Sequence, residues 1–239
     1  MEDKILQSVD QLNINRNDFK YTNRFGIPVP RVTEILSTMI HSDSLIYWSN
    51  ILGLKGKKYE EELDRAANYG TMVHSYIEKF FKTGENPSNW LISFDAFKRW
   101  YDKIISNYNF KLLYSEKELV CDYYGGTCDM VMELNGLNYI VDFKTSNHIT
   151  FKYMLQLAAY IYMLSLESIT INGAVILKLS KTLPEYNEYI LNFSNPDHKK
   201  YIDSCITTFH QLVSGYYHIK YCEEQYKILN LKGGYDNVC

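Results

Sequence analysis

An aspartate and a lysine separated by one residue close a short apolar segment of the chain. Side chains alternate between the two faces of a strand, so Asp142 and Lys144 would point to one side and Val141 and Phe143 to the other. A carboxylate beside an ammonium group can help to bind a divalent cation and to stabilise the charge that develops when water attacks a phosphate ester. Alone, such a pair is more often an ordinary surface ion pair, so the rest of the chain must supply the context.

A second carboxylate, that of Asp129, precedes this pair across a turn. Asn135-Gly136 is a strong two-residue hairpin signal between two segments with strand periodicity. Asp129 lies six positions before Asn135 and Asp142 six positions after Gly136, so antiparallel pairing brings the two aspartates almost opposite each other. Two converging carboxylates repel each other unless a cation compensates. Mg²⁺ or Mn²⁺ is the hard divalent ion that suits oxygen ligands.

The elements that would hold these residues change from helical to strand periodicity and back. This order predicts an α/β fold with a mixed central β-sheet flanked by α-helices. Apolar spacing predicts helices at 32–39, 60–82 (or two helices that meet near Gly70), 90–107, 150–166 and 196–217, and strands at 111–120, 127–134, 139–145, 173–180 and 186–193. We expect a single domain, with an N-terminal arm and short helix (1–40), a helical part (41–110), a catalytic sheet and helix (111–195) and a C-terminal helix (196–239).

Composition sets broad limits on location and partners. The net charge of −3 gives no overall attraction for nucleic acid, although a local basic patch can bind it in an acidic protein. The five cysteines include no CxxC pair and are expected to be reduced thiols. The N-terminal sequence lacks the pattern of a secretion signal, and no apolar run reaches the roughly 20 residues that span a bilayer. A cytoplasmic protein without membrane contact is expected.

A resemblance to a known nuclease family rests on four motifs. Together they resemble those of the PD-(D/E)XK superfamily, and the first resembles its RecB-like exonuclease branch, which includes the mitochondrial genome-maintenance exonuclease and phage exonucleases. The resemblance covers about residues 30 to 165 and implies a restriction-endonuclease-like core. In chain order, the motifs are Gly70-Thr71-Met72-Val73-His74, Gly126-Thr127-Cys128-Asp129, Ile140-Val141-Asp142-Phe143-Lys144-Thr145 and Gln156-Leu157-Ala158-Ala159-Tyr160.

Carried over position by position, the resemblance implies a metal centre. Asp129, Asp142 and the carbonyl oxygen of Phe143 would bind Mg²⁺ or Mn²⁺. Lys144 would be the catalytic lysine. His74 would be a further metal-site residue, although a histidine on an apolar helix is more often a hydrogen-bonded core or surface residue.

Other residues extend the predicted site. Glu116, on the strand before the hairpin, is expected to support metal or water, but Glu118 has the same facing and is an alternative. Gln156 and Tyr160 lie four apart on one helix face. They are expected to contact DNA or the lysine region, unless they form a polar edge on a buried helix. Thr145, directly after the lysine, is expected to contact nucleic acid.

The segment Pro30–Leu36 resembles an N-terminal stretch of the phage and mitochondrial members. Arg31 and Thr33 are therefore expected to hold a DNA phosphate at a helix start. Thr33 could equally cap that helix. The four-cysteine iron–sulfur pattern of some family members is absent, so no such cluster is expected.

These features predict a metal-dependent DNA exonuclease that hydrolyses phosphodiester bonds in single-stranded DNA or at DNA ends. We expect the enzyme to serve replication, repair or recombination of a phage or bacterial genome. Its expected protein partners are then a recombinase, a helicase or a single-strand-binding protein. A structure-specific or flap endonuclease would use the same chemistry, and a non-catalytic DNA-binding subunit would keep only the fold. A glycosidase could use paired carboxylates, but the neighbouring lysine has no role there.

Overall fold

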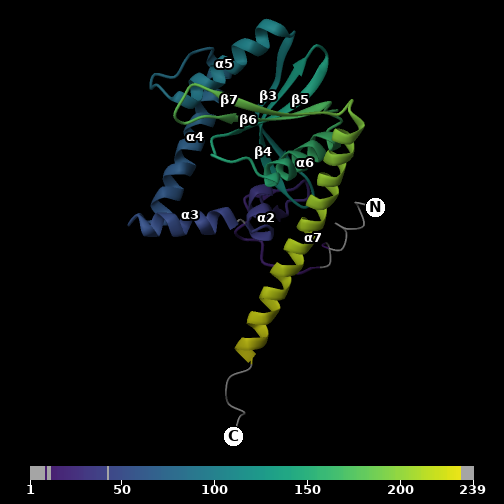
Figure 1. Cartoon of the computed structure of the whole chain (residues 1–239). Coiled ribbons are helices and arrows are strands. Elements are labelled where there is room, and N and C mark those ends of the chain that lie inside the picture. Colours follow the sequence, from purple (N-terminus) through teal and green to yellow (C-terminus); the bar gives the residue numbers. More distant parts are fainter. Residues whose placement is uncertain (1–8, 10–11, 42, 233–239) are drawn as a thin grey trace.

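The computed structural model describes residue 9, residues 12–41 and residues 43–232, and Figure 1 shows the order of their elements. The helices are α2 (Val32–Met39), α3 (Asp43–Leu54), α4 (Tyr59–Thr83), α5 (Ile92–Asn107), α6 (Phe151–Leu166) and α7 (Pro196–Lys232). The strands are β1 (Tyr21–Thr22), β2 (Pro28–Val29), β3 (Phe110–Val120), β4 (Gly125–Leu134), β5 (Leu137–Lys144), β6 (Gly173–Leu179) and β7 (Tyr186–Asn192).

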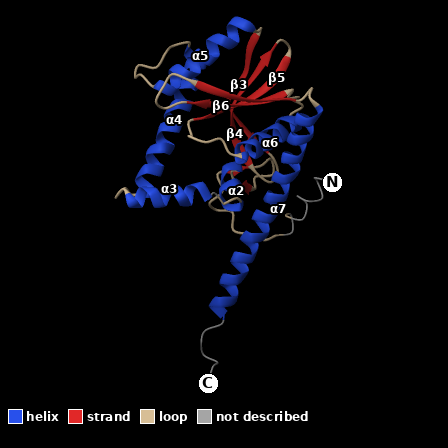
Figure 2. Ribbon diagram, viewed as in Figure 1, coloured by secondary structure: helices blue, strands red, loops and turns tan. Residues whose placement is uncertain are grey.

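A five-stranded mixed sheet with the order β3-β4-β5-β6-β7 organises the fold. Neighbouring strands are antiparallel except β5 and β6, which run parallel and are connected through α6. Helices lie on both sides of this sheet (Figure 2). The arrangement confirms the predicted α/β class and is consistent with a restriction-endonuclease-like core.

The hairpin between β4 and β5 has the predicted turn and register. Asn135 and Gly136 have φ angles of 51° and 83°, the positive values that a tight two-residue turn of this kind requires. Leu134 pairs with Leu137, and the ladder continues in that register to its last pair, Met130 and Val141. The next positions along this register are Asp129 and Asp142, as the spacing from the turn predicts.

Each face of the sheet packs against its own hydrophobic cluster. Met130, Val141 and Phe143 face the helices α4 and α5. Val131 and Ile140 face the layer formed by α2, α6 and α7. Alternation along β4 and β5 therefore decides which helical layer each side chain meets.

The long helix predicted at 60–82 is confirmed as α4, and the alternative of two helices that meet near Gly70 is wrong. The helix α4 continues through Gly70, because buried Val73 and Ile77 anchor it beyond a residue that costs only about 1 kcal/mol in a helix. The predicted end of the last helix at Tyr217 is wrong: α7 continues through Gly215 to Lys232, since a glycine inside a helix costs only about 1 kcal/mol and no proline follows it. The helix α3 and the short β1–β2 pairing were not predicted, because neither segment has a clear apolar period.

Four cysteines lie in the described part of the chain, and all are free. Cys121, Cys128 and Cys205 are buried, and Cys222 is exposed. Cys239 lies outside the described residues. Among the described helices, none combines the length and apolar character needed to cross a bilayer.

Candidate active site

The site begins where β4 and β5 stop pairing. Beyond Met130 and Val141, the carboxylate of Asp129 takes the place of a backbone acceptor, and its Oδ2 accepts a hydrogen bond of 2.7 Å from the N–H of Phe143. Asp129 is 8% exposed, so this bond forms in a largely dry environment. A side chain thus occupies the gap that opens between the strands.

On the other side of β4, the β3 backbone is distorted at Glu116. Ser115 pairs with Met130 and Lys117 with Cys128, so Glu116 lies opposite Asp129. Its φ of 48° lies in the left-handed region, which costs a residue with a side chain about 1–2 kcal/mol.

This geometry distinguishes between the two glutamates of β3. The half-buried carboxylate of Glu116 lies 3.5 Å from Nδ1 of His74. Glu118 is exposed and pairs across the ladder with Thr127. Only Glu116 of the two therefore lies beside Asp129.

The helix α4 supplies His74 to the same place. Buried Val73 and Ile77 fix the orientation of this helix against the sheet. Nε2 of His74 lies 3.1 Å from the carbonyl oxygen of Phe143, and Nδ1 lies 3.4 Å from Oδ1 of Asp129. His74 therefore bridges the end of β5 and the carboxylates of β3 and β4.

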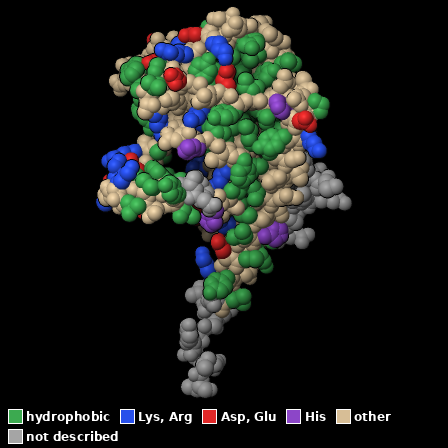
Figure 3. All heavy atoms as spheres, in the orientation of Figure 1, with side chains coloured by type: hydrophobic (Ala, Val, Ile, Leu, Met, Phe, Trp, Pro, Cys, Tyr) green, Lys and Arg blue, Asp and Glu red, His purple; other side chains and the backbone are tan. Residues whose placement is uncertain are grey.

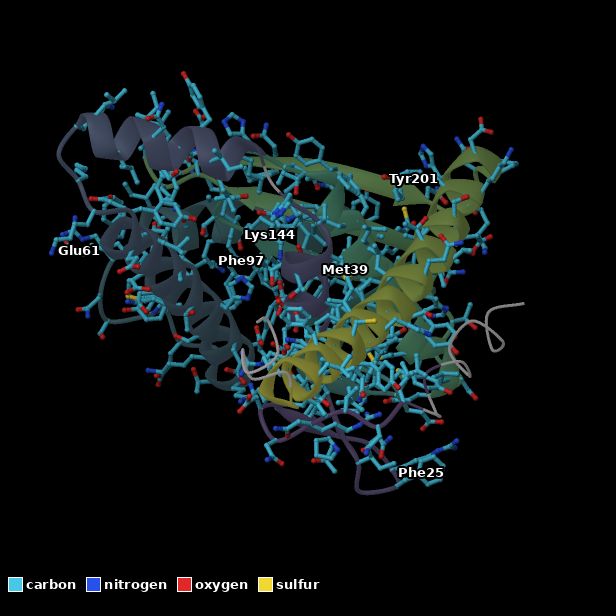
Figure 4. The ribbon with its side chains drawn as sticks, turned by 90° about the horizontal axis from the view of Figure 1, so that it is seen from below. Phe25, Met39, Glu61, Phe97, Lys144 and Tyr201 are labelled. Atoms are coloured by element: carbon cyan, nitrogen blue, oxygen red, sulfur yellow. The ribbon has the colours of Figure 1, made fainter. Side chains whose placement is uncertain are left out.

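A second set of contacts runs from β5 to α6. Nζ of Lys144 donates to Oδ1 of Asp142 at 2.8 Å and to Oε1 of Gln156 at 3.2 Å. Nε2 of Gln156 donates to the hydroxyl of Tyr160 at 3.2 Å. These contacts place Gln156 and Tyr160 beside the lysine. Figure 4 shows Lys144 near the centre of the molecule.

Burial and neighbouring charges shift the pKa values of these groups in different directions. Burial raises the pKa of Asp142 to about 6, and the Asp129 carboxylate adds to this effect. Burial opposes the charge on Lys144, but Asp142 and Asp129 outweigh it and raise the lysine pKa. Burial likewise favours neutral His74, but Asp129 outweighs it, with help from Glu116, and raises the pKa of His74 to about 10. The same interaction lowers the pKa of Asp129 despite its burial.

The donor set fits a divalent cation. Ligand atoms of His74, Glu116 and Asp129 lie within 4.8 Å of one another. Buried Oδ2 of Asp142 accepts no hydrogen bond, although Nζ of Lys144 lies 2.7 Å away as an ion-pair partner. Carboxylate oxygens suit Mg²⁺ or Mn²⁺. Asp142 is not one of the three grouped residues, and its carboxylate forms an ion pair with Lys144.

The residues predicted to contact DNA lie on different elements. Arg31 and Thr33 are exposed at the start of α2, and Arg31 forms an isolated bridge with Gly125. The N-cap of α2 is Arg31, and no side chain caps the helix, so the capping alternative for Thr33 is wrong. Thr145 directly follows Lys144, and its Oγ1 would be 3.5 Å from a Cβ placed on Gly70 of α4.

The surface is hollowed between α3 and α4 on one side and α2 and α7 on the other (Figure 3). Basic and histidine side chains are visible at the edge of this hollow. It lies next to the helix that carries His74.

One contact of Lys144 was missed from the sequence. Nζ of Lys144 lies 4.8 Å from the ring centre of Tyr153, and the hydroxyl of Tyr153 donates to Ser146 at 3.1 Å. Tyr153 lies three residues before Gln156 and therefore on the same face of α6. That spacing could have predicted the contact between Tyr153 and Lys144.

Comparisons with known proteins found structures of low similarity. A protein called SSO0001 is 14% identical over 87% of this chain and 84% of its own, with a TM-score of 0.37. An alkaline exonuclease from Laribacter hongkongensis is 9% identical over 66% and 86%, with a TM-score of 0.34. A phage related exonuclease from Haemophilus somnus 129PT is 11% identical over 60% and 80%, with a TM-score of 0.29. No family model and no curated protein matches the chain.

Replacing Gly126 with alanine should destabilise the protein, because a Cβ there would meet Cε1 of Tyr160 at 2.6 Å. We expect a loss of about 1–3 kcal/mol in the free energy of unfolding, measured with urea. Gly70→Ala is the matched control, since its Cβ would make only an ordinary contact with Thr145 and alanine favours a helix by up to ~1 kcal/mol. Equal stability of the two variants would contradict this account of Gly126.

The free energy of unfolding in the presence of EDTA should depend on pH through His74. Its pKa is raised from 6.5 to about 10 in the folded state, so its contribution is fully present below pH 6.5 and is lost as pH rises towards 10. The stability difference between the natural protein and His74→Gln should therefore shrink between pH 6.5 and 10. A difference that stays constant over this range would show that the imidazolium does not form.

Proposed function

We propose that this chain is a metal-dependent DNA nuclease of the PD-(D/E)XK type that acts as an exonuclease on single strands or DNA ends. The observation that supports it most is the meeting of two groups of side chains at the end of β5. One group contains His74, Glu116 and Asp129, and the other is the ion pair of Asp142 and Lys144. Together they offer cation ligands and a fixed ammonium group within one small region.

The residues of the chain divide the chemistry between them. His74, Glu116, Asp129 and the carbonyl oxygen of Phe143 would hold Mg²⁺ or Mn²⁺, and Asp142 would join them once it turns from Lys144. Such an ion makes a bound water more acidic and stabilises negative charge on a phosphate.

Lys144 can stabilise charge but is poorly suited to act as a base. Its neighbours raise its pKa, so the ammonium form persists at neutral pH. An ammonium group has three N–H donors, and Asp142 and Gln156 accept two of them. The third donor remains for an attacking water or a phosphate oxygen of the substrate.

Gln156 and Tyr160 would position the lysine. Gln156 accepts from Lys144 and donates to Tyr160, which fixes the orientation of its amide group. Burial raises the pKa of Tyr160 and keeps its hydroxyl neutral. The close approach of its ring to Gly126 limits how far this chain of contacts can move.

Lys144→Ala should lower cleavage of DNA by about two to three orders of magnitude, the cost of removing one preorganised donor at a reacting centre. The measurement is the release of label from 5′- and 3′-labelled linear DNA, with Mn²⁺ and with EDTA. Mn²⁺ affinity, measured by calorimetry, should remain. Lys111→Ala removes an exposed lysine at the far end of β3 and serves as the control. Turnover of Lys144→Ala near that of Lys111→Ala would overturn the assignment.

Linear and covalently closed circular single-stranded DNA distinguish an exonuclease from an endonuclease. An exonuclease needs an end, so it should degrade the linear strand in Mn²⁺ and leave the circle intact. Cutting of the circle at a comparable rate would instead indicate a structure-specific or flap endonuclease with the same site. Binding of both substrates without any metal-stimulated cleavage would indicate a non-catalytic DNA-binding subunit.

A further inference from the structure

Two lysines at the carboxyl end of β6 have no anionic partner within the described part of the chain. Lys178 is the residue before the last of β6, and Lys181 follows the strand by two residues. Both side chains are half-buried, and neither ammonium group forms an ion pair or a hydrogen bond with a described residue. Glu185 lies in the same loop, but its exposed carboxylate is not paired with Lys181. These two positive charges are therefore not compensated.

The register of the sheet places Lys178 beside Lys144. The two residues are partners in the parallel ladder between β5 and β6, so their side chains lie on the same face of strands that are about 4.8 Å apart. Asp142 balances the charge of Lys144 but not that of Lys178. Like charges on neighbouring strands repel each other, and an anion bound between them would offset this repulsion.

Lys181 lies at the helix that carries His74. Its Nζ is 5.4 Å from the ring centre of Tyr69 in α4. Tyr69 directly precedes Gly70, where an added Cβ would be 3.5 Å from Oγ1 of Thr145. Burial lowers the pKa of Lys181. An ammonium group in this position gains from a bound anion, because the anion would replace the water that the group has lost.

The segment that carries Lys181 is held in place by hydrogen bonds. Ser93 of α5 donates to the carbonyl oxygen of Ser180 at 2.7 Å, and the hydroxyls of Ser93 and Tyr69 lie 2.9 Å apart. The start of the loop is thus fixed to α4 and α5. A charge on a fixed segment loses less conformational entropy when it binds a ligand than a charge on a free loop does.

We propose that Lys178 and Lys181 bind the phosphodiester group next to the one that is cleaved, so that a DNA strand runs across the carboxyl ends of β5 and β6. Ligands of open α/β sheets bind outside the carboxyl ends of the strands, and β5 and β6 are the parallel pair of this sheet. Lys144 would face the reacting phosphate, and the lysines of β6 would face its neighbour. The proposal rests on the proposed nuclease function, because only that function places the reacting phosphate at Lys144.

Charge favours a local phosphate site of this kind. The chain as a whole has a net charge of −3, so any attraction for a phosphate backbone must come from a local group of cations. Lysine binds phosphate as a point charge and needs no fixed fork geometry. The alternative is that both lysines only extend their tips into water along an apolar surface. Their removal would then leave DNA binding unchanged.

Fluorescence anisotropy with a labelled single-stranded oligonucleotide tests the site in Mn²⁺. Lys144→Ala serves as the background, so that little DNA is cleaved during the measurement. In that background, Lys178→Met and Lys181→Met should each weaken binding by about tenfold, the value of one charged hydrogen bond. Each should also reduce the slope of log K against log salt by about 0.7, the contribution of one phosphate contact on a single strand.

Lys111→Met is the matched control, because Lys111 is an exposed lysine without an ion pair at the far end of β3. It should bind like the background chain. An unchanged affinity and slope in either variant at β6 would overturn the two-lysine site, and an equal loss in Lys111→Met would reduce it to a general effect of charge. Methionine keeps an unbranched stem, and unfolding in urea shows that the variants remain folded.

Two further results separate the failure of this site from the failure of the nuclease function. No binding of DNA by either the natural chain or the background chain would overturn both. Weaker binding in the two β6 variants, with no metal-stimulated cleavage by the natural chain, would retain the phosphate site and overturn the nuclease function.

Cleavage kinetics with Lys144 intact test which phosphate the two lysines contact. A contact with a neighbouring phosphate is made equally in the ground state and the transition state. Lys178→Met and Lys181→Met should therefore raise KM for single-stranded DNA by about tenfold at unchanged kcat. A lower kcat at unchanged KM would place the lysines at the reacting phosphate and overturn the assignment to its neighbour.

Discussion

Close packing of opposite charges in a largely buried part of the chain is the constraint on which the site depends. Asp129 and Asp142 are 8% and 1% exposed, and a buried carboxylate is costly unless a cation or hydrogen-bond donors compensate it. Lys144 compensates Asp142 through two close contacts, and protonated His74 compensates Asp129. The imidazolium thus supplies, without metal, the positive charge that a divalent ion would bring. Binding of such an ion by His74 would release a proton.

The backbone departs from regular strand geometry beside the buried carboxylate of Asp129. The ladder between β4 and β5 ends one residue before Asp129, whose carboxylate then accepts the N–H of Phe143. Opposite it, Glu116 adopts a positive φ and brings a second carboxylate to the same gap. Strain of this kind persists only where surrounding packing over-determines it. Here the hydrophobic clusters on both faces of the sheet supply that packing.

The sequence was sufficient for the parts of the fold that local periodicity controls. The Asn135-Gly136 turn set the register, and alternation placed Asp142 and Lys144 on one face of β5. The sequence could not decide between Glu116 and Glu118, because residues two apart lie on the same face of a regular strand. Only the contact of Glu116 with His74 distinguishes them. The end of α7 was not predictable either. Packing normally indicates where a helix ends, and its last turns have none within the described chain.

The two halves of the site come from opposite layers of the molecule, which explains why the strands must separate. Lys144 and Gln156 belong to the layer of α6, whereas His74 comes from α4 on the other face. A continuous ladder would keep these layers about 10 Å apart. Because β4 and β5 stop pairing at Met130, the carbonyl of Phe143 becomes available to His74. The break in the sheet therefore brings side chains from both faces to the same place.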